Sequence, residues 1–396
     1  MTVAAATGSG TGPDPLQATQ VAVAQVTERL DATPPDLALV FAGTAYAPAL
    51  DRIDALIADL LAPVHRLGAT TGGVIADGDE IERPDCIALW AANLDGVKIT
   101  PLRIPAPTDE RTGVRWPSPP ADAKGIVLLT DPLTFLPTAF LEWLEQAHPG
   151  LPVCGGQASA GRGANRLLLD GGIYDNGAVA VALGGDVRLR TLVSQGCRPI
   201  GKSYTITRAD RNLLQELGGT SAVQRVRETF TEGSPADKAL IRAAGLHIGT
   251  VIDEYKEEFG RGDFLVRGVL GAEPGTGAIA VGDLVSVGQT VQFHVRDADS
   301  ADEDLRALLD RIAKEGAKGS AALLFTCNGR GQRLFGEPNH DAGLVRQILG
   351  DIPLAGFFCA GEFGPVGSRN FIHGYTASLL LFEDDPRAEG AVSPDS

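Results

Sequence analysis

Three stretches of the chain repeat one pattern of apolar and polar positions. Each has a short apolar run, then apolar residues spaced three or four apart, then a second short apolar run that breaks at glycine. A smooth apolar run follows roughly twenty residues later, and this combination predicts a buried strand, an amphipathic helix and two further strands. The predicted helices cover residues 53–61, 135–147 and 340–349.

The pattern changes between the second and third repeats. Apolar runs with alternating character predict antiparallel strands at residues 246–252, 264–270 and 283–295, and two helices are expected at 221–230 and 235–244. The predicted fold class is therefore α/β with mixed sheets. We expect two related lobes, built from repeated strand–helix–strand–strand units with helices packed on the sheets.

Composition along the chain suggests four segments. Residues 1–34, rich in Ala, Gly, Thr and Pro, are expected to be disordered or weakly helical. An N-terminal domain over residues 35–218 and a C-terminal domain over residues 219–382 follow, joined near a Gly-Gly pair. The acidic stretch 383–396 is expected to be a frayed tail.

Charge and cysteine content narrow the function classes. The net charge of −16 over 396 residues argues against nucleic acid and against anionic membranes as partners, because both attract cationic surfaces. No apolar run reaches the ~20 residues of a membrane span, and no secretory signal pattern begins the chain. Five cysteines without a C-x-x-C pair favour a reducing compartment, so a cytoplasmic location is expected.

One motif matches a phosphate-binding loop. Residues 196–203 (GCRPIGKS) fit the pattern G-x-x-x-x-G-K-[ST], which binds phosphate only where it opens a helix. The following residues 204–207 (YTIT) favour a strand, and Pro199 removes one of the required amides. We therefore expect residue Ser203 to continue in an extended conformation, without nucleotide binding.

Polar residues bracketed by glycine follow two apolar runs of the third repeat. Arg330 lies between two glycines, where a ligand can approach closely, and its guanidinium suits a carboxylate or a phosphate. Glu362 could hold a ligand ammonium. Each also has a structural interpretation, as a salt bridge or as a cap for a neighbouring backbone. A single crossover helix should place the two strand ends side by side.

Several motifs in order resemble those of the FIST family. They are residues 194–201 (SQGCRPIG), 325–331 (FTCNGRG) and 361–365 (GEFGP), followed by Asn370 and by 373–376 (HGYT). The resemblance covers roughly residues 35–382, as an N-terminal and a C-terminal FIST domain. It implies an intracellular sensory module for small ligands, with amino acids as the favoured class. Because the chain carries no kinase, methyl-accepting or F-box segment, the signal is expected to pass to a separate protein partner.

The leading interpretation is a non-catalytic, cytoplasmic sensor of a small ligand, without cofactor or metal. The alternative is an enzyme that uses Cys197 or Cys359 as a nucleophile, which would require a thiol pKa lowered by a basic neighbour. The residues expected to bind the ligand are Gln195, Cys197, Arg198, Asn328, Arg330, Cys359, Glu362 and His373.

Overall fold

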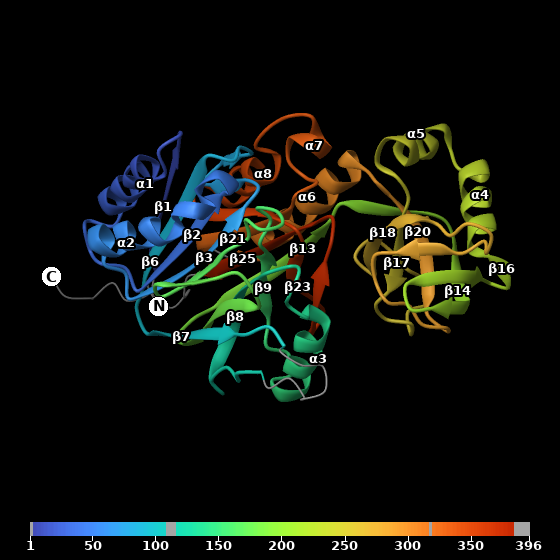
Figure 1. Cartoon of the computed structure of the whole chain (residues 1–396), viewed down its shortest axis with the longest axis horizontal. Helices are drawn as coiled ribbons and strands as arrows, with labels where there is room; N and C mark the ends of the chain where they lie inside the picture. Colours follow the sequence, from blue (N-terminus) through green and yellow to red (C-terminus); the bar gives the residue numbers. More distant parts are fainter. Residues whose placement is uncertain (1–2, 108–115, 317–318, 384–396) are drawn as a thin grey trace. The chain divides into compact units, whose positions relative to one another are not determined.

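The computed structural model describes residues 3–107, 116–316 and 319–383. These form two compact units, each drawn in Figure 1. Of the described residues, those up to 193, those within 305–372 and those from 376 onward belong to the large unit, and residues 194–304 and 373–375 form the small unit. The acidic tail predicted at residues 383–396 lies, apart from its first residue, outside the described residues.

The large unit contains three repeats, each built around a parallel strand–helix–strand unit, as predicted. The first repeat consists of β1 (Val3–Thr11), α1 (Pro15–Arg29), β2 (Leu37–Gly43), η1 (Thr44–Ala49), α2 (Leu50–Leu61), β3 (His65–Thr71), β4 (Val74–Ala76), β5 (Asp79–Ile81) and β6 (Cys86–Leu94). The second consists of β7 (Val97–Ile104), β8 (Ala123–Thr130), α3 (Pro137–Ala147), β9 (Val153–Gln157), β10 (Leu167–Leu169), β11 (Gly172–Tyr174) and β12 (Ala178–Gly185). The third consists of β13 (Leu189–Gln195), α6 (Ala298–Lys314), β21 (Gly319–Cys327), α7 (Gln332–Phe335), α8 (His340–Leu349), β22 (Leu354–Cys359), β23 (Glu362–Val366), β24 (Arg369–His373) and β25 (Thr376–Glu383).

The repeats exchange their β-hairpins in a cycle. The three sheets have the orders β1-β6-β2-β3-β10-β11, β7-β12-β8-β9-β23-β24 and β13-β25-β21-β22-β4-β5. In each sheet the last two strands come from a different repeat. Hairpin β4–β5 of the first repeat completes the third sheet. Hairpin β10–β11 of the second repeat completes the first sheet, and hairpin β23–β24 of the third repeat completes the second sheet. No repeat can therefore complete its own sheet.

Both faces of each sheet are buried. On β2, residues Leu39 and Phe41 point into a core shared by all three sheets, whereas Ala38 and Val40 face α1 and α2. The other sheets cover their outer faces in the same way, with α3 and with α6 and α8. Figure 1 shows α2, α3 and α8 on different sides of the large unit. This double burial explains why the central strands are continuous apolar runs.

Phenylalanine rings join two of the sheets in the shared core. The ring centroid of Phe41, on β2, lies 6.2 Å from that of Phe325 and 5.0 Å from that of Phe357. The latter two, on β21 and β22, are 5.5 Å apart at 86°, an edge-to-face contact. The second sheet contributes smaller residues such as Val127 and Leu129, on β8, to the same core.

Among the described residues of the N-terminal segment, expected to be disordered or weakly helical, 3–11 form a strand and 15–29 form a helix, so these parts are not disordered. Strand β1 pairs antiparallel with β6, and Asp14 caps α1. A Cβ atom on Gly8 would lie 2.2 Å from the carbonyl oxygen of Ala22. The small residues that suggested disorder instead let a strand and a helix pack backbone to backbone, and the helix is α1.

The small unit is built differently from the large one. One seven-stranded sheet has the order β14-β20-β17-β18-β19-β15-β16. Its elements are β14 (Cys197–Asp210), β15 (Leu213–Leu217), β16 (Thr220–Ser221), α4 (Ala222–Glu232), α5 (Pro235–Ala244), β17 (His247–Val251), β18 (Phe264–Ala272), β19 (Ile279–Val281) and β20 (Thr290–Arg296). The strand pairings among its described residues are antiparallel, as the sequence pattern predicts.

The α/β class is confirmed, but the division into two related lobes is not. All three repeats belong to the large unit, and the small unit is an insertion between β13 and the rest of the third repeat. The predicted boundary near Gly218 falls inside the small unit, because β15 and β16 pair across it. Residues 197–210 form one long strand, so Ser203 is extended and no helix follows the phosphate-loop motif, as expected.

Candidate functional site

The eight predicted site residues divide between the two units. The large unit holds Asn328, Arg330, Cys359 and Glu362, and the small unit holds Gln195, Cys197, Arg198 and His373. The pairing of β21 with β22 is parallel, and it brings Cys327 level with Cys359. The expected meeting of these two strand ends is thus present.

Arg330 forms an ion pair inside the large unit. Its side chain is fully buried, and its Nε and Nη2 atoms donate to the two carboxylate oxygens of Asp341 at 2.6 and 2.8 Å. The guanidinium carbon also lies 5.3 Å from the ring centroid of Phe335. Such bidentate geometry is the strongest ion pairing available to arginine. Arg330 therefore has a structural partner.

Asp341 is the centre of this buried network. It lies in the first turn of α8 and also accepts a hydrogen bond from the Thr326 hydroxyl at 2.8 Å, with His340 Nδ1 3.0 Å away. Burial by itself would raise the pKa of this carboxyl group, but the charge and hydrogen bonds of Arg330 outweigh that effect and hold the pKa below its usual range. Asp341 is therefore ionised at neutral pH.

Two glutamates on the exchanged hairpin β4–β5 and its C-terminal extension hold the same region. Glu80 Oε1 accepts the backbone N–H of Ala342 at 2.9 Å, and Glu82 Oε1 accepts that of Gln332 at 2.7 Å. The Glu80 N–H donates to Asn339 Oδ1 at 2.7 Å. These bonds hold the hairpin of the first repeat against the starts of α7 and α8 in the third.

Glu80 is a buried carboxyl group with unusual protonation. Its Oε2 atom is buried without a hydrogen-bond partner among the described residues. Burial, and secondarily the negative charge of Asp341, raise the pKa of Glu80 to about 7. The group thus exchanges its proton near neutrality.

Cys359 and Glu362 are also interior residues. Burial, followed by the negative charge of Glu362, raises the pKa of the Cys359 thiol well above its usual value. Glu362 is fully buried and accepts both the N–H and the hydroxyl of Thr376, at 3.2 and 2.8 Å. Of the four predicted residues here, Asn328 alone is exposed.

The predicted residues of the small unit are similarly engaged. Arg198 bridges Asp237 and Asp297, at 2.6 and 2.5 Å, and connects α5 with the end of β20. The Gln195 N–H donates to Asp304 Oδ2 at 2.8 Å. Cys197 and His373 are both buried.

Sequence reasoning missed a buried histidine cluster in the small unit. His247, on β17, packs edge-to-face against the ring of Tyr375 at 4.5 Å, and the ring of His294 lies 4.7 Å from that of Phe264. Burial lowers the pKa of each histidine to about 4, so both are neutral at pH 7. The described residues contain no group of three or more His, Cys, Asp or Glu side chains arranged to hold a metal ion.

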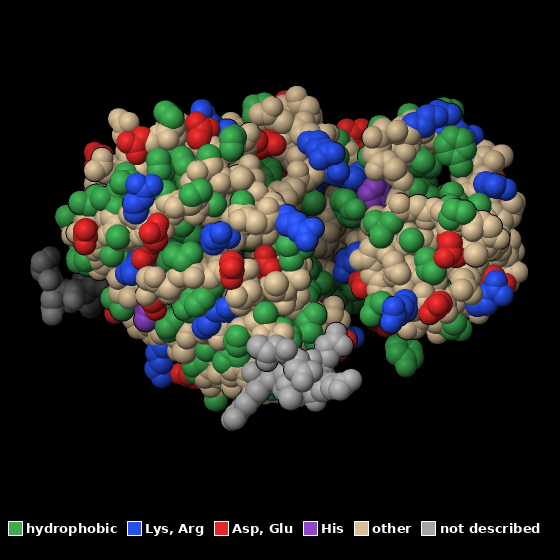
Figure 2. All heavy atoms as spheres, viewed as in Figure 1, with side chains coloured by type: hydrophobic (Ala, Val, Ile, Leu, Met, Phe, Trp, Pro, Cys, Tyr) green, Lys and Arg blue, Asp and Glu red, His purple; other side chains and the backbone are tan. Residues whose placement is uncertain are grey.

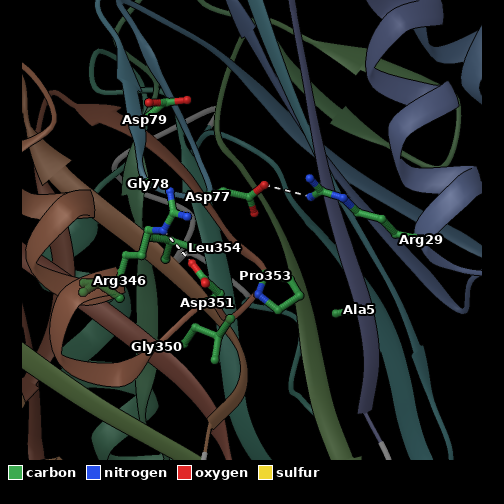
Figure 3. Close-up of a pocket in the computed structure, with 12 residues that line it drawn as sticks. Ala5, Arg29, Asp77, Gly78, Asp79, Arg346, Gly350, Asp351, Pro353 and Leu354 are labelled. Atoms are coloured by element: carbon green, nitrogen blue, oxygen red, sulfur yellow. Dashed lines mark hydrogen bonds and ion pairs between the residues drawn. The ribbon is translucent and has the colours of Figure 1, made fainter.

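The large unit has an open, charged cavity of about 520 Å³ that the sequence did not reveal (Figure 3). It lies where the turn between β4 and β5 meets the end of α8 and the start of β22. Its charged residues are Arg29, Asp77, Asp79, Arg346 and Asp351. They come from three separate segments of the chain, so no single motif contains them.

Two ion pairs face each other across this cavity. Arg29 enters from α1 and contacts Asp77 at 2.8 Å, and Arg346 enters from α8 on the opposite side and contacts Asp351 at 2.5 Å (Figure 3). The side chains of the second pair are 60% and 78% exposed. Exposed pairs contribute only about 0–1 kcal/mol, so a charged ligand can replace either partner at little cost.

Comparison with known proteins places the chain in a family. The FIST N domain model matches residues 36–220, and the FIST C domain model matches residues 222–365. The chain belongs to the FIST family, as its motifs predict, and FIST domains are associated with sensory and signal-transduction proteins. The two matches meet close to the boundary expected from the sequence.

Two mycobacterial proteins are similar over nearly their whole length. "Uncharacterized protein Mb0898c" of Mycobacterium bovis is 40% identical over 383 residues, which cover 96% of this chain and 98% of that protein. "Uncharacterized protein Rv0628c" of Mycobacterium tuberculosis is 40% identical over 382 residues, which cover 95% of this chain and 99% of that protein.

The buried ion pair should be essential for stability. Asp341→Asn leaves the Arg330 guanidinium buried without a counter-charge, and we expect the free energy of unfolding in denaturant to fall by about 3–5 kcal/mol. Asp351→Asn is the matched control, since it removes an exposed carboxylate paired with an arginine near the other end of α8, and should change stability by less than about 0.5 kcal/mol. Equal effects of the two changes would show that burial does not set the strength of the first pair.

Glu80 should make stability depend on pH. Because its pKa is raised to about 7 in the folded protein, its contribution is fully present below its unfolded pKa and is lost as the pH rises through 7. Glu80→Gln keeps an acceptor for the Ala342 N–H without the charge. The stability of the parent relative to this variant should fall between about pH 5 and about pH 8 in denaturant unfolding.

Comparing the parent with Glu80→Gln cancels the contribution of the other titratable groups to the pH dependence of stability. His247 and His294 have lowered pKa values, so their contribution to stability is lost as the pH falls, but both are present in the parent and in the variant. A difference that stays constant across this pH range would mean that Glu80 titrates normally in the fold.

Proposed function

We propose that the chain is a non-catalytic sensor that binds a small ligand with charges of both signs and passes the signal to a separate protein partner in the cytoplasm. An amino acid is the expected class of ligand. The observation that carries this proposal is the open cavity of the large unit, which presents two guanidinium groups and three carboxylates to solvent. A zwitterion is complementary to such an arrangement without help from a metal.

The predicted residues support binding less directly than the cavity does. Arg330 and Glu362, the expected partners of a ligand carboxylate and ammonium, are both fully buried and bonded to protein groups. Their partners would have to be displaced before a ligand could use them. Asn328, at the exposed end of β21, remains accessible and stays a predicted contact.

The chemistry of the thiols argues against the enzyme alternative. Nucleophilic cysteines require a lowered pKa, but burial raises the pKa of Cys86 and of Cys154 to about 12 and moves that of Cys359 in the same direction. Cys197, the other suggested nucleophile, packs in an apolar cluster with Val251, Phe264 and Val266.

The charge distribution and the helices of the described residues are compatible with a protein that binds small molecules. Figure 2 shows acidic and basic side chains interspersed on the viewed face, rather than gathered by sign. The net charge is −16. No helix in the described part of the chain has the length and apolar character needed to cross a bilayer.

A thermal-shift screen tests the proposal. Amino acids and related metabolites are added singly to the full chain, and a true ligand should raise the melting temperature progressively with concentration, because it binds the folded state. Alkylation of the same protein at neutral pH should label none of the four buried cysteines rapidly, whereas denaturant should expose all five. Rapid, stoichiometric labelling of one native cysteine would favour the enzyme, and the absence of any shift would favour an interaction scaffold.

A further inference from the structure

We infer that the cavity beside the β4–β5 turn is the ligand site, and that it takes an amino acid whose side chain carries a positive charge. This inference rests on the proposed function and adds the location and the ligand chemistry. It is drawn from a comparison of equivalent turns in the repeats, because the cyclic exchange of hairpins repeats the same local geometry with different side chains.

The turn between β10 and β11 shows the closed form of this geometry. Asp170 has a φ of +45°, and its N–H donates to the carbonyl oxygen of Arg66 at 2.9 Å. Its carboxylate accepts the Arg66 N–H at 2.7 Å and lies 3.1 Å from His65 Nδ1. The aspartate is therefore folded back onto the neighbouring strand and is occupied there.

The turn between β4 and β5 shows the open form. Asp77 has a φ of +53°, and its N–H donates to the carbonyl oxygen of Leu354 at 2.6 Å, so the backbone is held in the same way. The residues that correspond to His65 and Arg66 are Pro353 and Leu354, according to the strand registers. Proline and leucine offer no charged side chain, and the carboxylate of Asp77 points toward Arg29 and the cavity instead (Figure 3).

Glycine keeps the open turn accessible. A Cβ atom on Gly78 would lie 2.9 Å from Cδ of Arg346. Its absence leaves room for the arginine side chain to lie over the turn, as Figure 3 shows. The two halves of the cavity are thus brought together by a hairpin from the first repeat and a helix from the third.

The two ion pairs differ in how firmly they are held. Arg29 also donates to the carbonyl oxygen of Thr7 at 2.7 Å, which fixes one wall. Arg346 and Asp351 are more exposed and lie within five positions of each other at the end of α8. The α-carboxylate of the ligand therefore replaces Asp351 as the partner of Arg346, and the released Asp351 takes the α-ammonium.

The charge balance selects a further positive group. The cavity has three carboxylates against two guanidiniums, and the last carbonyl groups of α8 add partial negative charge at the same end. Once the ligand's α-carboxylate pairs with Arg346 and its α-ammonium pairs with Asp351, the carboxylates of Asp77 and Asp79 have only the guanidinium of Arg29 as a counter-charge within the cavity. A ligand with an amino or guanidino side chain balances this excess, whereas an acidic amino acid increases the repulsion.

The test is a titration of the full chain with L-arginine and L-lysine, followed by calorimetry. Asp77→Asn and Arg346→Gln should each weaken binding by about 10-fold or more, the loss of one charge-assisted contact. Asp170→Asn changes the same residue in the equivalent closed turn and should leave the affinity unchanged. L-glutamate should bind more weakly than either basic amino acid.

The outcomes distinguish a wrong location of the ligand site from a wrong proposed function. If a basic amino acid binds and both cavity variants bind it like the parent, the location is wrong although the sensory function stands. If an amino acid of another charge is preferred and the cavity variants weaken it, the location stands and the preference for a positive side chain is wrong. If no small molecule binds the parent, the proposed function fails together with this inference.

Discussion

The exchange of hairpins between repeats is the constraint on which the large unit depends. Each hairpin strand that joins a foreign sheet completes backbone hydrogen bonds that neither repeat can satisfy alone. The exchange also closes the shared core, since the three sheets bury their inner faces against one another. In the third sheet it carries Glu80 to the start of α8 and Glu82 to the start of α7, where they accept backbone N–H groups near the buried Arg330–Asp341 pair. The charged cavity exists only because of the same connection.

Much of the local structure follows from the sequence because its signals are local. The parallel strand–helix–strand units have long apolar runs and clear helical spacing, so their type could be predicted. The hairpin exchange could not be predicted. Strands such as β4 have three residues, too few for a periodic signal, and Ala76 pairs with Ala355 from a distant part of the chain. The N-terminal strand was missed because its glycines suggested disorder, although they serve close packing on α1.

In the candidate site, too, local features could be predicted from the sequence, whereas features that depend on tertiary packing could not. Sequence reasoning singled out Arg330 and Glu362 correctly as unusual residues at strand ends, but it could not decide between a ligand and a protein partner. That choice depends on tertiary burial, and in this structure Asp341 and Thr376 supply the partners. The open cavity was missed for the opposite reason: its charged residues are ordinary surface types in sequence, and they become notable only when folding brings three segments together.

The most direct test of the proposed ligand site is hydrogen–deuterium exchange with and without L-arginine. The account predicts slower exchange at residues 77–79 and 350–354, which line the cavity, and unchanged exchange at the equivalent turn around Asp170. Protection confined to other segments, or no protection while calorimetry records binding, would contradict the placement of the ligand at the exchanged hairpin.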